Sequence, residues 1–142
     1  MKILLKKLSS RSPNWKKCEN SRSINIIHSY VGDIKKSLSI VINKISYAKN
    51  EAKNAKETAA NIKCLKTAEN ADDAKNYIHD ARSKISDASR ELHRAGYEYD
   101  FNKLSFHMSK KKDYINQTLI RMNYALIELQ DSLVSLEDCN KK

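Results

Sequence analysis

Residues 45–62 read ISYAKNEAKNAKETAANI, and small or apolar side chains recur there at steps of three and four. The six positions are Ile45, Ala48, Ala52, Ala55, Ala59 and Ile62. This spacing places all six side chains on one face of an α-helix, the pattern of a helix that packs along another helix. Most of these side chains are alanine methyl groups, which allow two helix backbones to approach more closely than leucine would.

The same spacing continues toward the amino terminus without a break. The additional positions are Ile24, Ile27, Val31, Ile34, Leu38 and Val41. The whole seam spans about six heptads, and three or four are already typical of a coiled coil. We therefore predict one long helix over about residues 23–65.

A second seam of the same kind begins after the segment KTAEN at residues 66–70. Its positions are Ala71, Ala74, Ile78, Ala81, Ile85, Ala88, Leu92 and Ala95. Because this seam is out of phase with the first, we expect the chain to reverse near residues 66–70. The alternative is an uninterrupted helix, since no Gly or Pro marks a break there. Asn70 is then the N-cap of the second helix, with Asp72 and Asp73 in its first turn.

Gly96 has two interpretations. It can end the second helix, with Asp100 capping the next one. Alternatively, the helix bends at Gly96 and continues to the lysines at 110–112. A stop at residue 95 would leave the most apolar part of the first helix, residues 24–34, without this partner. We therefore predict a bent, continuous helix over about 70–109.

A last helix is predicted over about 113–137, with residues 139–142 as a tail. The inward positions are Ile115, Leu119, Met122, Leu126, Leu129, Leu133 and Leu136, and the flanking ones are Ile120, Ile127 and Val134. Because this helix is shorter than the others, we expect it to cover only the Ile/Val/Leu half of the first helix. The alanine-rich half then remains a two-helix hairpin.

The expected fold is all-α and forms a single domain over residues 23–138. It is a three-helix bundle, consisting of a long antiparallel hairpin with a third helix packed along one end. The candidate close-packing positions are Ala48, Ala52, Ala55, Ala59, Ala74, Ala81 and Ala88.

With 142 residues, the chain has the length of one domain. Its two glycines and one proline argue against turn-rich β folds and glycine-rich phosphate loops.

The net charge of +10 is concentrated at the amino terminus. Residues 1–22 form a basic arm, either a solvated tail or a segment that binds an anionic partner. Its candidate binding residues are Lys2, Lys6, Lys7, Arg11, Trp15, Lys16, Lys17 and Arg22. Lys49, Lys56 and Lys63 recur every seven residues beside the alanine seam and form a second candidate, the lysine strip.

The sequence offers no pattern of reactive side chains. None of the four histidines has the Glu-x-x-His or His-x-x-x-His spacing of a helical metal site. No serine or cysteine lies in a recognisable nucleophile motif. We therefore expect no enzymatic activity, no metal or other cofactor and no small-molecule substrate.

Targeting signals are also missing from the sequence. The apolar run at residues 3–5 is too short for the core of a secretory signal, and no apolar stretch of about 18 residues exists. Cys18, Cys64 and Cys139 are odd in number and widely separated. These features together favour a reducing, cytoplasmic setting.

The favoured function is a non-catalytic helical interaction or assembly module, which binds a protein partner or self-associates through coiled-coil surfaces. The main alternative is a small nucleic-acid-binding protein that uses the basic arm and the lysine strip. A third alternative is a peripheral membrane-surface binder that uses the segment MKILLKKL. It is the weaker one, because one short segment binds membranes only marginally.

Overall fold

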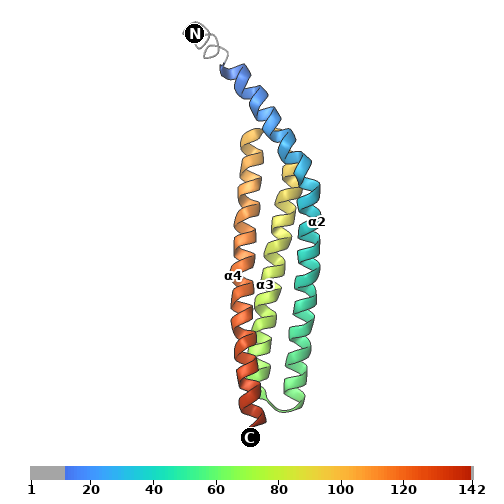
Figure 1. Cartoon of the computed structure of the whole chain (residues 1–142), viewed down its shortest axis with the longest axis vertical. Helices are drawn as coiled ribbons and strands as arrows, with labels where there is room; N and C mark the ends of the chain where they lie inside the picture. Colours follow the sequence, from blue (N-terminus) through green and yellow to red (C-terminus); the bar gives the residue numbers. More distant parts are fainter. Residues whose placement is uncertain (1–11, 142) are drawn as a thin grey trace.

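The computed structural model describes residues 12–141, with side chains from residue 21 onward, and these residues form three α-helices. They are α2 (Ser12–Asn61), α3 (Leu65–Gly96) and α4 (Phe101–Asn140). Figure 1 shows that α2 and α4 run in the same direction and α3 in the opposite one. The prediction of an all-α three-helix bundle built on an antiparallel hairpin is confirmed.

The seam of α2 is buried at every seventh residue. The buried positions are Ile24, Val31, Leu38, Ile45, Ala52 and Ala59, each 3–6% exposed. On α3 all eight predicted seam residues, from Ala71 to Ala95, are buried. The α3 seam and the row of α2 from Ile24 to Ala59 therefore face the interior, whereas Val41, Ala55 and Ile62 of the first predicted seam are exposed.

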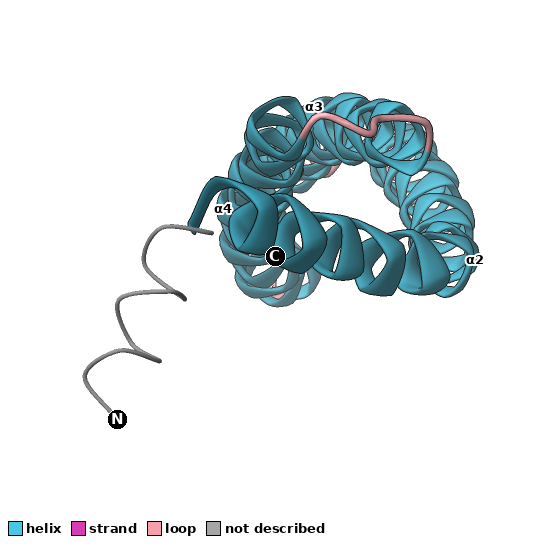
Figure 2. Cartoon of the chain, turned by 90° about the horizontal axis from the view of Figure 1, so that it is seen from above, coloured by secondary structure: helices cyan, strands magenta, loops and turns pink. Residues whose placement is uncertain are grey.

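α3 is the central element of the bundle, because α2 and α4 each pack extensively on it but contact each other much less. Figure 2, viewed along the bundle, shows the three helices arranged around a common axis. Beyond Leu104 near its start, the buried residues of α4 are small: Thr118, Ala125 and Ser132. These short side chains bring α4 close to the alanines of α3.

The reversal between α2 and α3 occurs at residues 62–64, earlier than the predicted 66–70. Lys63 adopts a left-handed conformation with φ of 62°. The Cys64 amide donates to Ala59 O at 2.9 Å and the Lys63 amide donates to Ala60 O at 3.1 Å. These two bonds form a Schellman motif, in which the left-handed position is usually glycine. Because a lysine occupies it here, no glycine marks the turn in the sequence.

The prediction that Asn70 caps the second helix is wrong. Asn70 lies inside α3 and is buried, and its Nδ2 donates to Ser135 Oγ of α4 at 3.0 Å. Asp72 consequently lies beyond the first turn. The side chain that made Asn70 a plausible cap instead pairs with a polar group on a neighbouring helix.

The prediction of a continuous helix bent near Gly96 is also wrong, because α3 ends at Gly96. Asp100 caps α4, and its Oδ1 accepts from the Lys103 amide at 3.0 Å. The earlier reversal shifts α3 along α2, so that His28 Nε2 hydrogen-bonds Ala95 O at 2.9 Å. Leu104 at the start of α4 then covers Ile24, so no continuous helix is needed there.

Two further helix boundaries differ from the prediction. α4 starts at Phe101 and includes the lysines at 110–112, so it runs along the whole of α3 rather than along one end. α2 starts at Ser12 rather than near residue 23. Pro13 fits a first helical turn, where its missing amide hydrogen costs no hydrogen bond. Figure 1 shows the first turns of α2 extending past the other two helices.

Candidate interaction surface

An open groove lies between α2 and α4 at the alanine-rich end of the bundle. Its volume is about 580 Å³. Its apolar lining consists of Ala55 and Ala59 of α2, Ile62 in the turn that follows α2, and Leu129, Leu133 and Leu136 of α4. Thr67 of α3 also lines it. The groove exists because α2 and α4 both follow α3 but make little contact with each other.

The alanine positions fall into three classes. Ala52, Ala59, Ala74, Ala81 and Ala88 are buried, and Ala48 is half-buried. Ala55 is exposed and lines the groove, so its assignment to the packed seam is wrong. The third helix does reach this end of the bundle, but the space in front of Ala55 remains open.

The outward side of α4 is a second apolar surface, the α4 face. It consists of two rows at seven-residue spacing, each 50–63% exposed: Leu119, Leu126 and Leu133, and Ile120, Ile127 and Val134. The prediction that the leucine row faces the core is wrong. The neighbouring small residues at 118, 125 and 132 are buried instead, because they allow α4 a closer approach to α3.

The sequence of α4 explains why it has two apolar sides. Residues 116–136 form three heptads, NQTLIRM, NYALIEL and QDSLVSL. The third residue of each heptad is small and buried, and the seventh is half-buried. The fourth and fifth residues are large, apolar and exposed. A single hydrophobic periodicity cannot show which of two apolar rows faces inward.

Two of the three lysines of the lysine strip contact α3. Lys49 Nζ donates to His79 Nδ1 at 2.9 Å, and Lys56 Nζ donates to Asp72 Oδ1 at 2.9 Å. Lys75 Nζ also lies 3.1 Å from Asp72 Oδ1, so this carboxylate separates two lysines on facing helices. The hydrogen bonds from Lys56 and Lys75 lower the pKa of Asp72. These contacts offset the repulsion expected between the lysines of facing helices.

The basic arm lies largely beyond what the structure describes. Lys2, Lys6, Lys7 and Arg11 are outside the described residues. Trp15, Lys16 and Lys17 belong to α2, but their side chains are not described; Arg22 is exposed. Lys63 occupies the left-handed position of the α2–α3 turn. Binding of an anionic partner by these residues remains a prediction.

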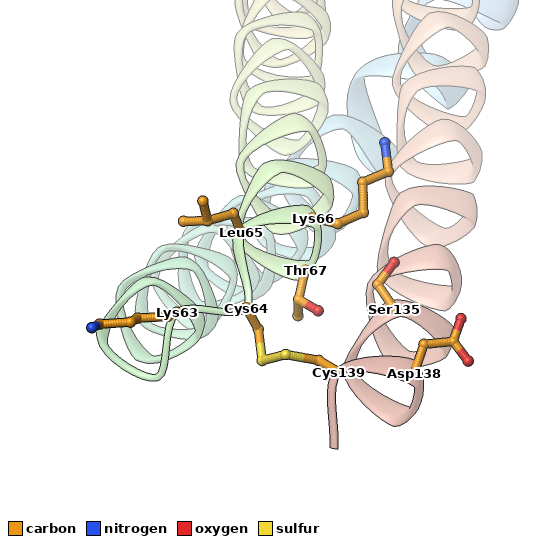
Figure 3. A pocket seen from close by; sticks show the side chains of 8 residues that line it. All are labelled: Lys63, Cys64, Leu65, Lys66, Thr67, Ser135, Asp138 and Cys139. Atoms are coloured by element: carbon orange, nitrogen blue, oxygen red, sulfur yellow. A yellow bond between two sulfur atoms is a disulfide. The ribbon is translucent and has the colours of Figure 1, made fainter. Parts of the chain in front are cut away.

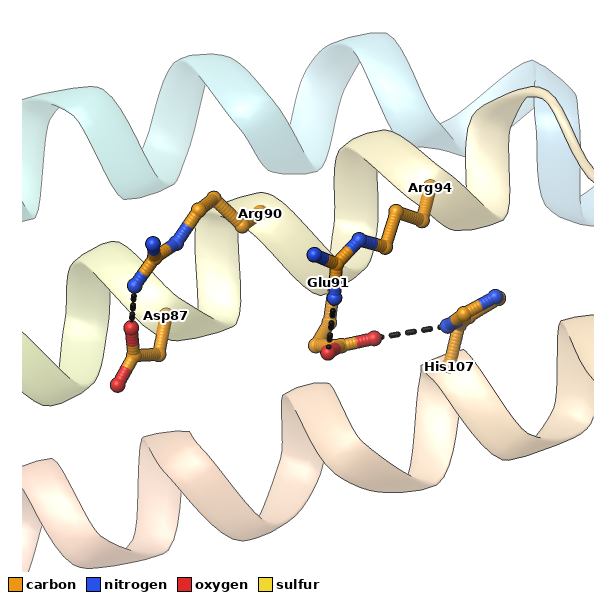
Figure 4. Close-up of polar contacts among 5 residues, drawn as sticks. All are labelled: Asp87, Arg90, Glu91, Arg94 and His107. Carbon is orange, nitrogen blue, oxygen red and sulfur yellow. Dashed lines mark hydrogen bonds and ion pairs between the residues drawn. The ribbon is translucent and has the colours of Figure 1, made fainter.

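A buried carboxylate between α3 and α4 was not predicted from the sequence. Glu91 is only 7% exposed. Its Oε1 accepts from Arg94 Nη1 at 2.8 Å, and its Oε2 lies 2.7 Å from His107 Nδ1 (Figure 4). One turn earlier, Asp87 pairs with Arg90. Because both Glu91 oxygens are paired, the cluster fixes the α3–α4 register and leaves no free oxygen for a ligand.

A disulfide bond joins Cys64, in the α2–α3 turn, to Cys139 at the end of α4. Figure 3 shows the bond at one side of a small pocket of about 320 Å³, with Lys66 and Asp138 at its rim. Disulfide bonds persist mainly in oxidising compartments. The bond therefore argues against the reducing, cytoplasmic setting expected from the odd cysteine count.

None of the described helices has a segment long and apolar enough to cross a membrane.

Among the described side chains, residues 21–141, no three His, Cys, Asp or Glu residues are grouped to hold a metal ion. No protein-family model, curated protein or solved structure matches the chain. The groove and the α4 face are thus the features on which a function can be argued.

Proposed function

We propose that this protein is a non-catalytic interaction module that binds a helical partner along the α4 face and the adjoining groove. The observation that carries the proposal is the exposure of six large apolar side chains in two regular rows on one helix. Single exposed apolar residues are normal on soluble proteins, but a continuous apolar strip is typical of a binding surface.

A helix is the partner shape that fits this surface. The two rows recur every seven residues, as do the positions that contact a second helix in a coiled coil. Leu133 belongs to the α4 face and also lines the groove, so the two surfaces are continuous. Burying one large apolar side chain that is about half exposed contributes roughly 1 kcal/mol, so the six side chains contribute roughly 6 kcal/mol. The apolar side chains that the partner buries against them add to this total, which must exceed the entropic cost of association.

Site-specific photo-crosslinking tests the proposal. Leu126, at the centre of the face, is replaced by a photo-reactive phenylalanine derivative in the full-length chain, expressed in its native cells. Ser83, exposed on α3, carries the same group as the control. We expect a discrete protein adduct from position 126 that is absent from position 83. The proposal is wrong if neither position, or both equally, form adducts.

A further inference from the structure

We propose that the Cys64–Cys139 disulfide bond is a redox switch for the groove: reduction of the bond detaches the end of α4, residues 136–140, and removes Leu136 from the groove wall. This inference rests on the proposed function, because it names the regulation of the same surface. It is carried by the place of the bond in a pocket, by the weak packing around it and by the position of Leu136 between the bond and the groove.

The bond is accessible from the pocket beside it. Both cysteines line this pocket of about 320 Å³, together with polar and charged side chains such as Ser135 and Asp138 (Figure 3). Cys64 is only 5% exposed, whereas Cys139 is half-buried. Access is one of the factors that decide which sulfur of a disulfide a thiolate attacks. An incoming thiol therefore reaches the Sγ atom of Cys139 before that of Cys64.

A small dithiol reduces the bond in two exchange steps. One of its thiolates attacks Cys139 Sγ, so that a mixed disulfide forms while the Cys64–Cys139 bond breaks and Cys64 leaves as a thiolate. The second thiolate of the dithiol then attacks the dithiol's own sulfur in the mixed disulfide, and Cys139 leaves. Both cysteine thiolates take a proton from water. Two electrons thereby pass from the dithiol, which ends as a cyclic disulfide, to the cysteine pair.

The packing around the bond involves little apolar area. The buried residues of this cluster are small, namely Ala59, Cys64 and Ala68, and Leu136 and Cys139 of α4 pack against them. The free energy gained by burial scales with the apolar area removed from water, so side chains of this size contribute little. The covalent bond is therefore the main attachment of this end of α4.

The polar contacts between α4 and α3 end before the last turn of α4. Ser132 Oγ donates to Thr67 O at 3.1 Å, and Ser135 Oγ accepts from Asn70 Nδ2 at 3.0 Å. Among the side chains of residues 21–141, none beyond Ser135 makes a hydrogen bond or an ion pair with another helix. Detachment of residues 136–140 consequently breaks no such contact.

The last turn of α4 is also unfavourable as a helix end. Residues 137–140 include Glu137 and Asp138 but no basic residue, and Lys141 follows only after the helix has ended. Negative side chains at the carboxyl end of a helix lie against the negative end of its dipole. The turn is thus held by the bond rather than by its own stability, and it frays when the bond is reduced.

Leu136 connects the bond to the groove. Its side chain packs on the cluster around the bond and also lines the groove. Cys139 follows it by three residues, so both side chains lie on the same side of α4. When the turn that holds Cys139 detaches, Leu136 loses this support and the groove loses part of its apolar wall. The groove is then complete in an oxidising setting and incomplete in a reducing one.

Hydrogen–deuterium exchange, resolved to single amides by NMR, tests the switch in the full-length chain. All samples carry Cys18→Ala, so that Cys64 and Cys139 are the only cysteines. In the oxidised chain we expect protected amides at residues 136–140. Dithiothreitol should speed their exchange about tenfold or more, to near the rate of an unfolded peptide. The added changes Cys64→Ala and Cys139→Ala should give the same fast exchange without a reductant.

Amides at the centre of α3, such as those of the buried residues Ile78 and Leu92, are the control for folding and should stay protected in every sample. Protected amides at residues 136–140 in the reduced chain overturn the inference, as do unprotected ones in the oxidised chain. Loss of protection at Ile78 and Leu92 as well would mean that reduction unfolds the whole bundle rather than its end. A bond that dithiothreitol does not reduce is not a switch.

Photo-crosslinking connects the switch to the proposed function. The photo-reactive group is placed at Ala55, which lines the groove from α2 and therefore does not move with α4. We expect an adduct in the wild type that is mostly lost in the chain without Cys64 and Cys139. If position 126 forms an adduct but position 55 forms none, or forms the same in both chains, only this inference fails. If neither position forms an adduct in the wild type, the proposed function fails, and the exchange experiment still decides whether the bond holds α4.

Discussion

Gly96 of α3 lies so close to Val31 of α2 that a Cβ atom on Gly96 would be 3.1 Å from Val31 Cγ1. Val31 is buried in the main core cluster, and its β-branched side chain has little rotamer freedom. Gly32, in contrast, has nothing within 4 Å of the equivalent point. The two glycines thus differ in what a methyl group would meet, although both lie in helices.

This difference predicts opposite results for two alanine substitutions. Gly32→Ala should stabilise the protein by up to about 1 kcal/mol, because alanine favours helix over glycine. Gly96→Ala should be less stable than Gly32→Ala by about 1–3 kcal/mol, the cost of overpacking. Urea denaturation measures both free energies of unfolding. Equal stabilities would mean that Val31 moves aside without cost.

Leucine substitutions at Ala52 and Ala55 test the groove. Ala52 is 3% exposed in the core cluster, so Ala52→Leu should overpack the α2–α3 contact and cost about 1–3 kcal/mol. Ala55 lines the open groove, so Ala55→Leu should be tolerated. Thermal melts at several protein concentrations provide the measurement. A large loss of stability at position 55 would show that the groove is closed in solution.

Acid sensitivity is expected from Asp72. The Lys56 and Lys75 hydrogen bonds hold its pKa below the ordinary value of 3.8. A carboxylate with a lowered folded-state pKa stabilises the protein above its unfolded-state pKa, and this contribution is lost as the pH falls through the folded-state pKa. Between pH 7 and about pH 4 the contribution should stay constant, and below pH 4 it should decline.

Asp72→Asn removes that contribution at every pH. The free energy of unfolding of the variant, measured by urea titration from pH 7 to about pH 2, should approach that of the wild type below about pH 4. Because the Asp72 side chain is one-third exposed, the difference at pH 7 should not exceed about 1 kcal/mol. A difference that persists undiminished at the lowest pH would contradict the assignment to this carboxylate.

Removal of the disulfide bond should destabilise the bundle. Cys64 and Cys139 are 75 residues apart in sequence, so the bond restricts a long loop in the unfolded chain. The double variant Cys64→Ala/Cys139→Ala should lose about 2–4 kcal/mol in urea denaturation. A reductant should produce a similar loss in the wild type and no further loss in the variant. If the reductant leaves the wild type unchanged, the two cysteines are not bonded in solution.

Nucleic-acid binding by the basic arm is the remaining prediction from the sequence. Deletion of residues 1–22 should abolish it, because this arm carries most of the net charge. Contact with about five phosphates of duplex DNA would give a slope of about −4.5 for log affinity against log salt concentration. Fluorescence anisotropy with a labelled duplex measures both effects. If the full-length chain does not bind at low salt, this function is excluded. If binding survives the deletion, the binding site is the lysine strip rather than the basic arm.

Helical periodicity predicted the fold class, the buried face of α3 and the buried row of α2 from Ile24 to Ala59. It also assigned Val41, Ala55 and Ile62 to the first seam, although these residues are exposed. Periodicity did not locate the α2–α3 turn, because the sequence does not distinguish a lysine in a left-handed conformation from any other lysine. Gly96 was misassigned for a related reason. Its role is to accommodate Val31, and that depends on how far α3 is shifted along α2.

The hydrophobic pattern of α4 alone could not predict which of its rows is exposed as the candidate surface. The leucine row of α4 is more hydrophobic than the row at 118, 125 and 132, so a hydrophobicity argument assigns the leucines to the core. The structure favours the small row, because α3 offers alanines that only short side chains can approach. The Cys64–Cys139 bond was missed because no local spacing marks a pair so far apart in the chain.

The same bond makes the three helices unequal in their freedom to move. α3 and α4 are joined at one end by residues 97–100 and at the other by the disulfide bond, so the pair forms a covalently closed ring. α2 is covalently linked to that ring only through the turn at Lys63 and otherwise packs on it. Any large opening of the bundle must therefore swing α2 about this turn while α3 and α4 stay together. Among the three described helices, only α2 is free to exchange with another copy while the disulfide bond remains intact.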